Sequence, residues 1–149
     1  MTQEERQLLL KDLCARLLYG IIAYASEINK NGIITDVNIP YNMVNLTVDN
    51  ASGKYELVPL FDIKPYLRPM SSMTEEEHEE LLDKVQKDWS IDIDKLGDLY
   101  FDIGDACYPD IDLFLDIIDW LNKNHFDYRG LIKKGLAIAV TEENNPYKE

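Results

Sequence analysis

The sequence has few of the residues that indicate a catalytic or metal-binding site. Its 149 residues include two cysteines and two histidines, and it contains no glycine-rich phosphate loop, no GxSxG nucleophile elbow and no CxxC pair. His78, in the segment EEHEE, lacks the second histidine of an HExxH zinc site. We therefore assign no catalytic residue, no metal and no cofactor from the sequence.

Long hydrophobic runs are also missing. The longest apolar stretch, residues 17–25, is interrupted by Tyr and Gly and is far shorter than the roughly 20 residues that a membrane-spanning helix needs. The polar, acidic start of the chain does not resemble a secretory signal, so a cytoplasmic location is expected. In that reducing compartment Cys14 and Cys107 are expected to be free and mostly buried thiols.

Basic residues are scarce in the second half of the chain. The net charge is −13; residues 1–73 hold eight acidic and seven basic residues, whereas residues 74–149 hold twenty and eight. Nucleic-acid phosphates and anionic lipids are bound through Lys and Arg. Direct binding to nucleic acid or to a membrane is therefore disfavoured.

The first 70 residues have the pattern of a helix followed by a small sheet. Thr2 and Glu5 have the spacing of a capping box, and an apolar stripe follows at helical spacing: Leu9, Leu10, Leu13, Cys14 and Leu17. Short runs rich in Ile, Val, Tyr and Thr predict an antiparallel meander of about four strands at residues 20–28, 33–39, 43–48 and 54–60. Asn31 and Gly32 are predicted to form the first turn, and residues 63–69 a stiff proline connector.

The rest of the chain predicts helices and a final short strand. Thr74 and Glu77 repeat the capping box, with Leu81, Leu82, Val85 and Trp89 on the buried face of a second helix. Residues 90–109 are predicted to be irregular. A third helix opening at Asp110 carries its apolar residues on one face: Ile111, Phe114, Leu115, Ile118 and Leu121.

The opposite side of this third helix is predicted to be an acidic face made by Asp112, Asp116 and Asp119. A short helix containing Leu131 and Ile132 and a strand at residues 136–140 complete the prediction. The fold class is therefore α+β, in a single domain of residues 1–149 with a helix and small sheet at 1–69 and an acidic helical half at 70–149.

Aspartate is unusually dense in residues 88–119, which hold ten Asp residues and one basic residue, Lys95. A calcium site is one interpretation, but EF-hand spacing fails because Leu96 and Ile103 stand where oxygen ligands belong. Two interpretations remain open. The carboxylates form a solvated acidic face, or they mimic a polynucleotide and occupy the basic groove of a partner.

A small hydrolase or transferase remains an alternative to a binding protein. It would combine Cys107, His125 and a nearby aspartate, although acidic neighbours disfavour a thiolate. His78 is better explained at the edge of a helix stripe, and His125 by a helix C-cap or a pairing with Asp127.

Protein binding is predicted instead from aromatic and arginine residues, which dominate interface hot spots. The candidates are Tyr66, Arg68, Trp120, Phe126, Tyr128 and Arg129. The alternative is that these residues attach the connector and the C-terminal segment to the core.

Three segments carry a resemblance to a family: LLLKDLCARLLYG at residues 8–20, IKPYLRPMSSMTEEE at 63–77 and DWLNKNHFDYRGLIKKGLA at 119–137. Together they resemble a family of small uncharacterised proteins encoded by gut anaerobic bacteria and their prophages. The resemblance implies a cytoplasmic accessory protein associated with mobile elements and transfers no active-site residue. The leading prediction is a non-enzymatic accessory or modulator protein that binds an unknown protein partner.

Overall fold

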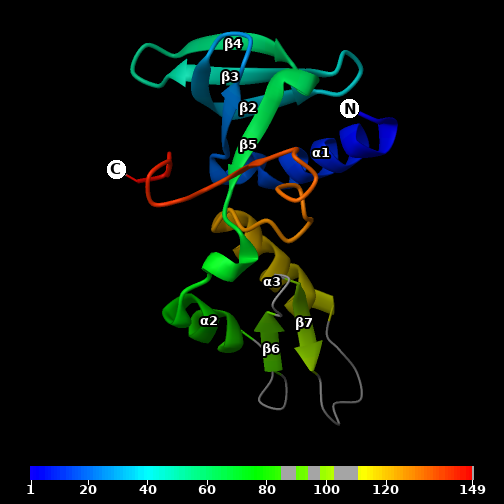
Figure 1. The fold of residues 1–149 in the computed structure, drawn as a ribbon, viewed down its shortest axis with the longest axis vertical. Coiled ribbons are helices and arrows are strands. Elements are labelled where there is room, and N and C mark those ends of the chain that lie inside the picture. The colour runs from blue at the N-terminus through cyan, green and yellow to red at the C-terminus, as the bar shows by residue number, and fades with distance from the viewer. Residues whose placement is uncertain (85–89, 94–97, 103–110, 149) are drawn as a thin grey trace. The chain divides into compact units, whose positions relative to one another are not determined.

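The computed structural model describes residues 1–84, 90–93, 98–102 and 111–148. These form a mixed α+β fold with an N-terminal helix, as predicted, and the chain divides into two compact units (Figure 1). Unit 1 comprises Met1–Leu67 and Arg129–Glu149, and unit 2 comprises Arg68–Tyr128. The boundary expected after residue 69 lies close to the first junction, but the last part of the chain belongs to unit 1. The single domain stays a prediction.

Helix α1, Gln3–Arg16, begins unit 1 with the predicted capping box. The Glu5 N–H donates to Thr2 Oγ1 at 3.1 Å, and the Thr2 N–H donates to Glu5 Oε2 at 2.7 Å. The helix buries Leu9 and Leu13, while Cys14 is exposed. The expectation of a buried thiol was wrong here because Cys14 lies on the solvent side of the helix. Cys107 lies outside the described residues.

The sheet of unit 1 has six strands in the order β4-β3-β2-β1-β5-β8 (Figure 1). The predicted antiparallel meander forms four of these strands: β1 (Ile22–Ala25), β2 (Lys30–Asn38), β3 (Met43–Asp49) and β4 (Lys54–Pro59). The expected number of about four strands was too low, because β5 and β8 extend the sheet beyond β1. Short 3-10 turns, η1 (Leu17–Tyr19) and η2 (Leu60–Asp62), precede β1 and β5.

The predicted proline connector is in part a strand. β5 (Ile63–Leu67) pairs antiparallel with β1, and β8 (Ile138–Ala139) pairs parallel with Tyr66 and Leu67. Ile63, Pro65 and Leu67 are buried at alternate positions. The alternation of apolar residues therefore favoured a strand more than Pro65 disfavoured one. Since β8 pairs only with Tyr66 and Leu67, Pro65 lies where β5 forms the sheet edge and where a missing N–H is tolerated.

The predicted turn at Asn31 and Gly32 was also wrong, because both residues lie inside β2. Asn29, with φ of +51°, supplies the left-handed residue of that turn instead. Gly32 is required for a different reason. A Cβ atom there would lie 2.6 Å from the Thr47 carbonyl oxygen and 2.7 Å from Leu46 Cγ, which no side chain can accommodate without moving the neighbouring strand.

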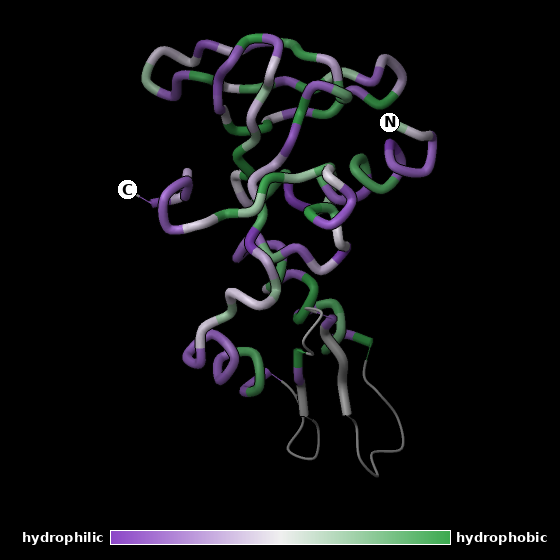
Figure 2. The backbone as a smooth tube through the Cα atoms, in the orientation of Figure 1, coloured by the Kyte–Doolittle hydropathy of each residue, from purple (hydrophilic) through white to green (hydrophobic). Residues whose placement is uncertain are grey.

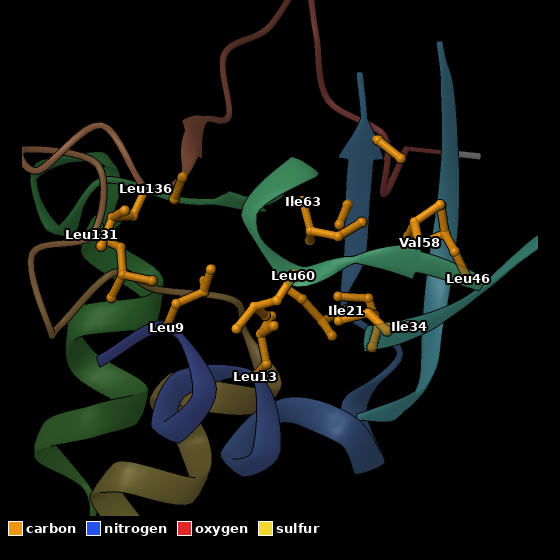
Figure 3. Close-up of a cluster of buried hydrophobic side chains, with 14 of the residues drawn as sticks. Leu9, Leu13, Ile21, Ile34, Leu46, Val58, Leu60, Ile63, Leu131 and Leu136 are labelled. Atoms are coloured by element: carbon orange, nitrogen blue, oxygen red, sulfur yellow. The ribbon is translucent and has the colours of Figure 1, made fainter. Parts of the chain in front are cut away.

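The hydrophobic core of unit 1 lies between α1 and the sheet. Leu9 and Leu13 of α1 point toward side chains from β2, β3, β4, η2 and β5 (Figure 3). Leu131 and Leu136 join this core, although the predicted short helix around Leu131 is a series of turns. The backbone is left-handed at Gly130 and Gly135, and these two residues leave too few between them for a helix.

A buried ion pair is part of this core. Arg16 donates from Nε to Asp12 Oδ2 at 2.8 Å and from Nη2 to Asp12 Oδ1 at 3.0 Å, and both side chains are 0% exposed. Arg129 Nε lies 3.5 Å from Asp12 Oδ1. Two arginines from distant parts of the sequence therefore converge on one buried carboxylate.

Tyr147 attaches the C-terminal segment to the sheet. Its hydroxyl donates to the Tyr66 carbonyl oxygen at 2.8 Å and accepts from the Ile22 N–H at 3.2 Å. Burial raises the pKa of Tyr147, so the phenol is neutral at physiological pH. A neutral hydroxyl is required because it donates one of these bonds.

Unit 2 contains η3 (Met70–Ser72), α2 (Glu75–Leu82), β6 (Ser90–Ile93), β7 (Leu99–Asp102) and α3 (Ile111–Lys123). The capping box of Thr74 and Glu77 is confirmed; Val85 and Trp89 lie outside the described residues. β6 and β7 pair antiparallel, so the prediction of irregular structure was wrong for these strands. Figure 2 shows that hydrophilic residues dominate the beginning of α2.

The buried face of α3 agrees with the predicted one at Leu121 but is otherwise shifted around the helix. Ile117, Trp120 and Leu121 are buried, whereas Ile111 and Leu115 are 70% and 56% exposed. The helix buries the side that packs with Met70, Leu81 and Phe126. Helical periodicity indicated an apolar stripe, but this packing contact selected a different side of the helix. Asp110, the expected first residue, lies outside the described residues.

Candidate partner-binding surface

An open apolar groove lies in unit 1, where the start of α1 meets the β2–β3 turn and the end of β4. Its volume is about 590 Å³. The lining residues are Met1, Thr2, Gln3, Arg6, Tyr41, Asn42, Met43, Pro59, Leu60 and Phe61. Apolar side chains are in the majority, and Arg6 is the only charged residue among them. This composition is typical of a site for an apolar group.

The local backbone fixes the shape of the groove. The Leu60 N–H donates to the Asn42 carbonyl oxygen at 2.8 Å and joins its two sides. Asn42 has a φ of +52°, a left-handed conformation that Asn tolerates better than most residues. Asn38 Oδ1 accepts from the Tyr41 N–H at 3.2 Å and closes the turn. Tyr41 and Phe61 are therefore held next to the groove by short, bonded segments.

Large apolar side chains are exposed in and beside the groove. Tyr41 is 77% exposed, Phe61 72% and Met1 54%. Further large exposed side chains follow on the same strands and turn: Ile39, Tyr55 and Leu57. Pro59 lines the groove, and alternation along β4 places Tyr55 and Leu57 on the same sheet face as Pro59. Clustered exposed apolar side chains of this kind indicate an interaction surface.

The aromatic and arginine residues predicted to bind a partner lie elsewhere. In unit 2 the Arg68 guanidinium carbon lies 4.2 Å from the centroid of the Phe126 ring. Phe126 in turn stacks on Trp120, with centroids 5.7 Å apart. Phe126 and Trp120 are 0% and 5% exposed, and the Tyr128 hydroxyl donates to Asn122 Oδ1 at 2.9 Å. These contacts are made within unit 2 and favour a packing role.

The other two predicted residues belong to unit 1. The Tyr66 hydroxyl donates to Asn31 Oδ1 at 3.2 Å, and Arg129 lies beside Asp12. Both side chains are half-buried. For all six residues the partner-binding role stays a prediction.

Arg68 also makes a bidentate ion pair with Glu77. Its Nη1 and Nη2 donate to Glu77 Oε2 at 2.6 Å and Oε1 at 2.7 Å. The two side chains are 24% and 19% exposed. Hydrogen bonds from Arg68 lower the pKa of Glu77, with a smaller contribution from the Thr74 N–H. This pair attaches the start of unit 2 to the first turn of α2.

The net negative charge of the protein belongs almost entirely to unit 2. Unit 2 holds seventeen acidic and five basic residues, a net charge of −12, whereas unit 1 holds eleven and ten, a net charge of −1. Asp112, Asp116 and Asp119 of the predicted acidic face are exposed, and so are most carboxylates of α2. The net charges of the two units therefore equal those of the two halves of the sequence, −1 and −12, but unit 2 carries its charge on 61 residues rather than 76.

The two histidines have different surroundings within unit 2. His78 lines an open groove of about 500 Å³ with Ser71, Thr74, Glu79 and Asp92 among its neighbours. His125 has a φ of +62° directly after α3, and its carbonyl oxygen accepts from the Arg68 N–H at 2.8 Å. A C-cap was one of the two interpretations of His125, and this geometry fits it.

Cys107 of the hypothetical catalytic site lies outside the described residues, as do residues 94–97 and 103 of the twelve-residue segment considered for calcium. In the described parts of the chain, no three His, Cys, Asp or Glu side chains gather as a metal site would need. The hydrolase or transferase alternative stays a prediction.

Comparisons with known proteins give no relative. No protein-family model matches the chain, and neither the curated proteins nor the solved structures contain a match. Among the residues that the structure describes, no helix is long and apolar enough to cross a membrane.

Sequence reasoning missed the apolar groove. Tyr41 directly follows Pro40, and Phe61 lies two residues after Pro59, each just beyond a predicted strand. Neither residue was among the predicted binding residues. The available signal was the presence of large aromatic residues in turns, where polar residues are usual.

Proposed function

We propose that the protein is a non-enzymatic accessory protein that binds another protein through the apolar groove of unit 1. The observation that carries this proposal is the exposure of Tyr41 and Phe61, at 77% and 72%, on the two sides of one groove. Aromatic side chains bury much area at little entropic cost and are enriched among interface hot spots. The resemblance to prophage-encoded proteins supports an accessory role linked to mobile elements.

The partner that fits this groove contributes an apolar side chain or a short apolar segment. The groove is lined mainly by apolar residues, and Arg6 supplies one positive charge for an acidic residue that flanks the apolar segment. Burial of both aromatic rings on binding would supply most of the affinity. Such binding depends weakly on salt.

A second candidate function is favoured by the charge of unit 2. A net charge of −12 confined to one unit supports the mimicry of a polynucleotide, in which exposed carboxylates occupy the basic surface of a nucleic-acid-binding protein. Binding of this kind weakens steeply as salt rises.

Affinity capture from cell lysate with matched variants tests both candidates. The double variant Tyr41→Ser/Phe61→Ser removes the two exposed rings of the groove. Leu18→Ser is its control, because Leu18 is 90% exposed and does not line the groove. The triple variant Asp112→Asn/Asp116→Asn/Asp119→Asn removes the acidic face of α3.

We expect the groove variant to lose the captured partner, by tenfold or more, while Leu18→Ser and the triple variant retain it. Loss with the triple variant alone, together with release at moderate salt, would favour mimicry. Capture of no partner by the unmodified protein contradicts both candidates.

A further inference from the structure

The sheet of unit 1 ends at β4, and no described strand lies beyond it. The orientation of its backbone follows from two observations. The Leu60 N–H donates to Asn42 across the β3–β4 pair, and the register pairs Val58 with Val44 and Glu56 with Leu46. Since hydrogen-bonded positions alternate along an antiparallel pair, Val58 and Glu56 bond to β3.

The backbone groups of Tyr55, Leu57 and Pro59 therefore point away from β3, toward the open edge. Pro59 has no N–H to leave unpaired there, which agrees with an edge strand. Tyr55 and Leu57 each present an N–H and a C=O, and their side chains are 64% and 59% exposed. An edge with free backbone groups and exposed apolar side chains is a template for another strand.

We propose that this edge binds the β4 edge of a second copy of the chain, so that two sheets join in an antiparallel β4–β4 pair centred on Tyr55. This inference goes beyond the proposed function, because it uses the edge of β4 and leaves the groove free for a partner.

The charges on β4 select this register. A twofold axis at Tyr55 places Lys54 of each copy opposite Glu56 of the other. These two positions do not exchange backbone bonds, so their side chains approach closely, and opposite charges there attract. Lys54 and Glu56 thus form two symmetry-related ion pairs, and the two Tyr55 residues exchange two backbone hydrogen bonds between them.

The neighbouring registers are less favourable. An axis at Glu56 would place Glu56 directly opposite its own copy, which repels. An axis at Leu57 would place Tyr55 opposite Pro59, which has no N–H to donate, and would leave Lys54 without Glu56. An axis between two residues would align outward-facing backbone groups with inward-facing ones. Only the Tyr55 register combines backbone pairing with charge complementarity.

The exposed face of β4 also gains contacts in this arrangement. The two Tyr55 rings lie side by side across the axis, and Leu57 of one copy lies diagonal to Tyr55 of the other. Aromatic and aliphatic side chains interact at such positions. Part of the exposed apolar area of β4 is thereby removed from water.

Sedimentation equilibrium of the full chain over a range of concentrations tests the proposal. We expect a monomer–dimer equilibrium. Lys54→Glu and Glu56→Lys should each weaken dimerisation by about tenfold or more, because each turns two attractive pairs into two repulsive ones. The double variant Lys54→Glu/Glu56→Lys should restore the dimer, because the opposite charges again face each other. Lys64→Glu, an equal charge change at an exposed position on β5, should have no effect.

A strictly monomeric protein at all concentrations would overturn the proposal. So would a dimer that the single reversals leave intact, or one that the double variant fails to restore. Circular dichroism of each variant verifies that unit 1 is folded. Because Tyr41 and Phe61 are unchanged in these variants, loss of the dimer with retained partner capture separates this proposal from the proposed function.

Discussion

Each unit contains a bidentate arginine–carboxylate pair, and the two pairs have different surroundings. In unit 1 the pair of Asp12 and Arg16 is 0% exposed and lies in a unit of net charge −1. In unit 2 the pair of Arg68 and Glu77 is 24% and 19% exposed and lies in a unit of net charge −12. Loss of one partner of the buried pair would leave an uncompensated charge in the core, which costs much stability. Water and salt screen the charges of the more exposed pair, so its loss costs less.

Removal of one partner of the buried pair should have the largest effect on stability. Asp12→Ala leaves Arg16 buried without its carboxylate, and we expect a loss of about 3–5 kcal/mol in the free energy of unfolding. Urea unfolding followed by far-UV circular dichroism measures it. The double variant Asp12→Leu/Arg16→Leu removes both charges and should lose much less. An Asp12→Ala loss below about 1 kcal/mol would contradict the role assigned to this pair.

The corresponding change in unit 2 should have a smaller effect. Glu77→Gln keeps the shape of the side chain and removes its charge, and we expect a loss of about 1 kcal/mol. Both tryptophans of the chain, Trp89 and Trp120, belong to unit 2, so tryptophan fluorescence follows the unfolding of this unit. Glu76→Gln is the matched control, because Glu76 is exposed on the same helix turn. Equal effects of the two variants would contradict a specific role for Glu77.

Low pH should lower the stability of unit 2 through the pair of Arg68 and Glu77. The pKa of Glu77 is lowered in the folded protein from its ordinary value of 4.5. A lowered pKa contributes stability that is complete above the ordinary value and is lost as pH falls through the folded pKa. We expect tryptophan-monitored stability to fall below about pH 4.5 more steeply in the unmodified protein than in Glu77→Gln. Parallel pH profiles would contradict this.

Added salt should have the smallest effect on stability, and this effect should differ between the two units. Raising ionic strength screens the repulsion among the carboxylates of unit 2, while unit 1 is near neutral. We expect added NaCl to raise the stability of unit 2 by less than about 1 kcal/mol and that of unit 1 hardly at all. Hydrogen exchange of core amides in each unit measures the difference. A larger stabilisation of unit 1 would be inconsistent with the charge distribution.

Local rules predicted the features that depend on neighbours in sequence. Both capping boxes, at Thr2 and Thr74, and the four-strand meander follow from short patterns, and the structure confirms them. The failures occur where distant contacts decide. β5 forms because β1 and β8 pair with it, and α3 buries Trp120 rather than Leu115 because of packing with residues such as Met70.

The buried ion pair and the groove were not predictable from local patterns. Asp12 and Arg16 have the spacing of an ordinary surface pair on a helix, and their burial depends on the sheet and on the segment that begins at Arg129. Tyr41 and Phe61 are brought together by the pairing of β3 with β4. Neither arrangement leaves a periodic signal in the sequence.

The central claim is that the apolar groove of unit 1, and not the acidic surface of unit 2, binds the partner. The most direct measurement is the Kd of the captured, purified partner at about 0.05 M and about 0.5 M NaCl. The account predicts that the two Kd values agree to within a few-fold. A Kd that rises a hundredfold or more at the higher salt concentration would contradict it and assign binding to the carboxylates of unit 2.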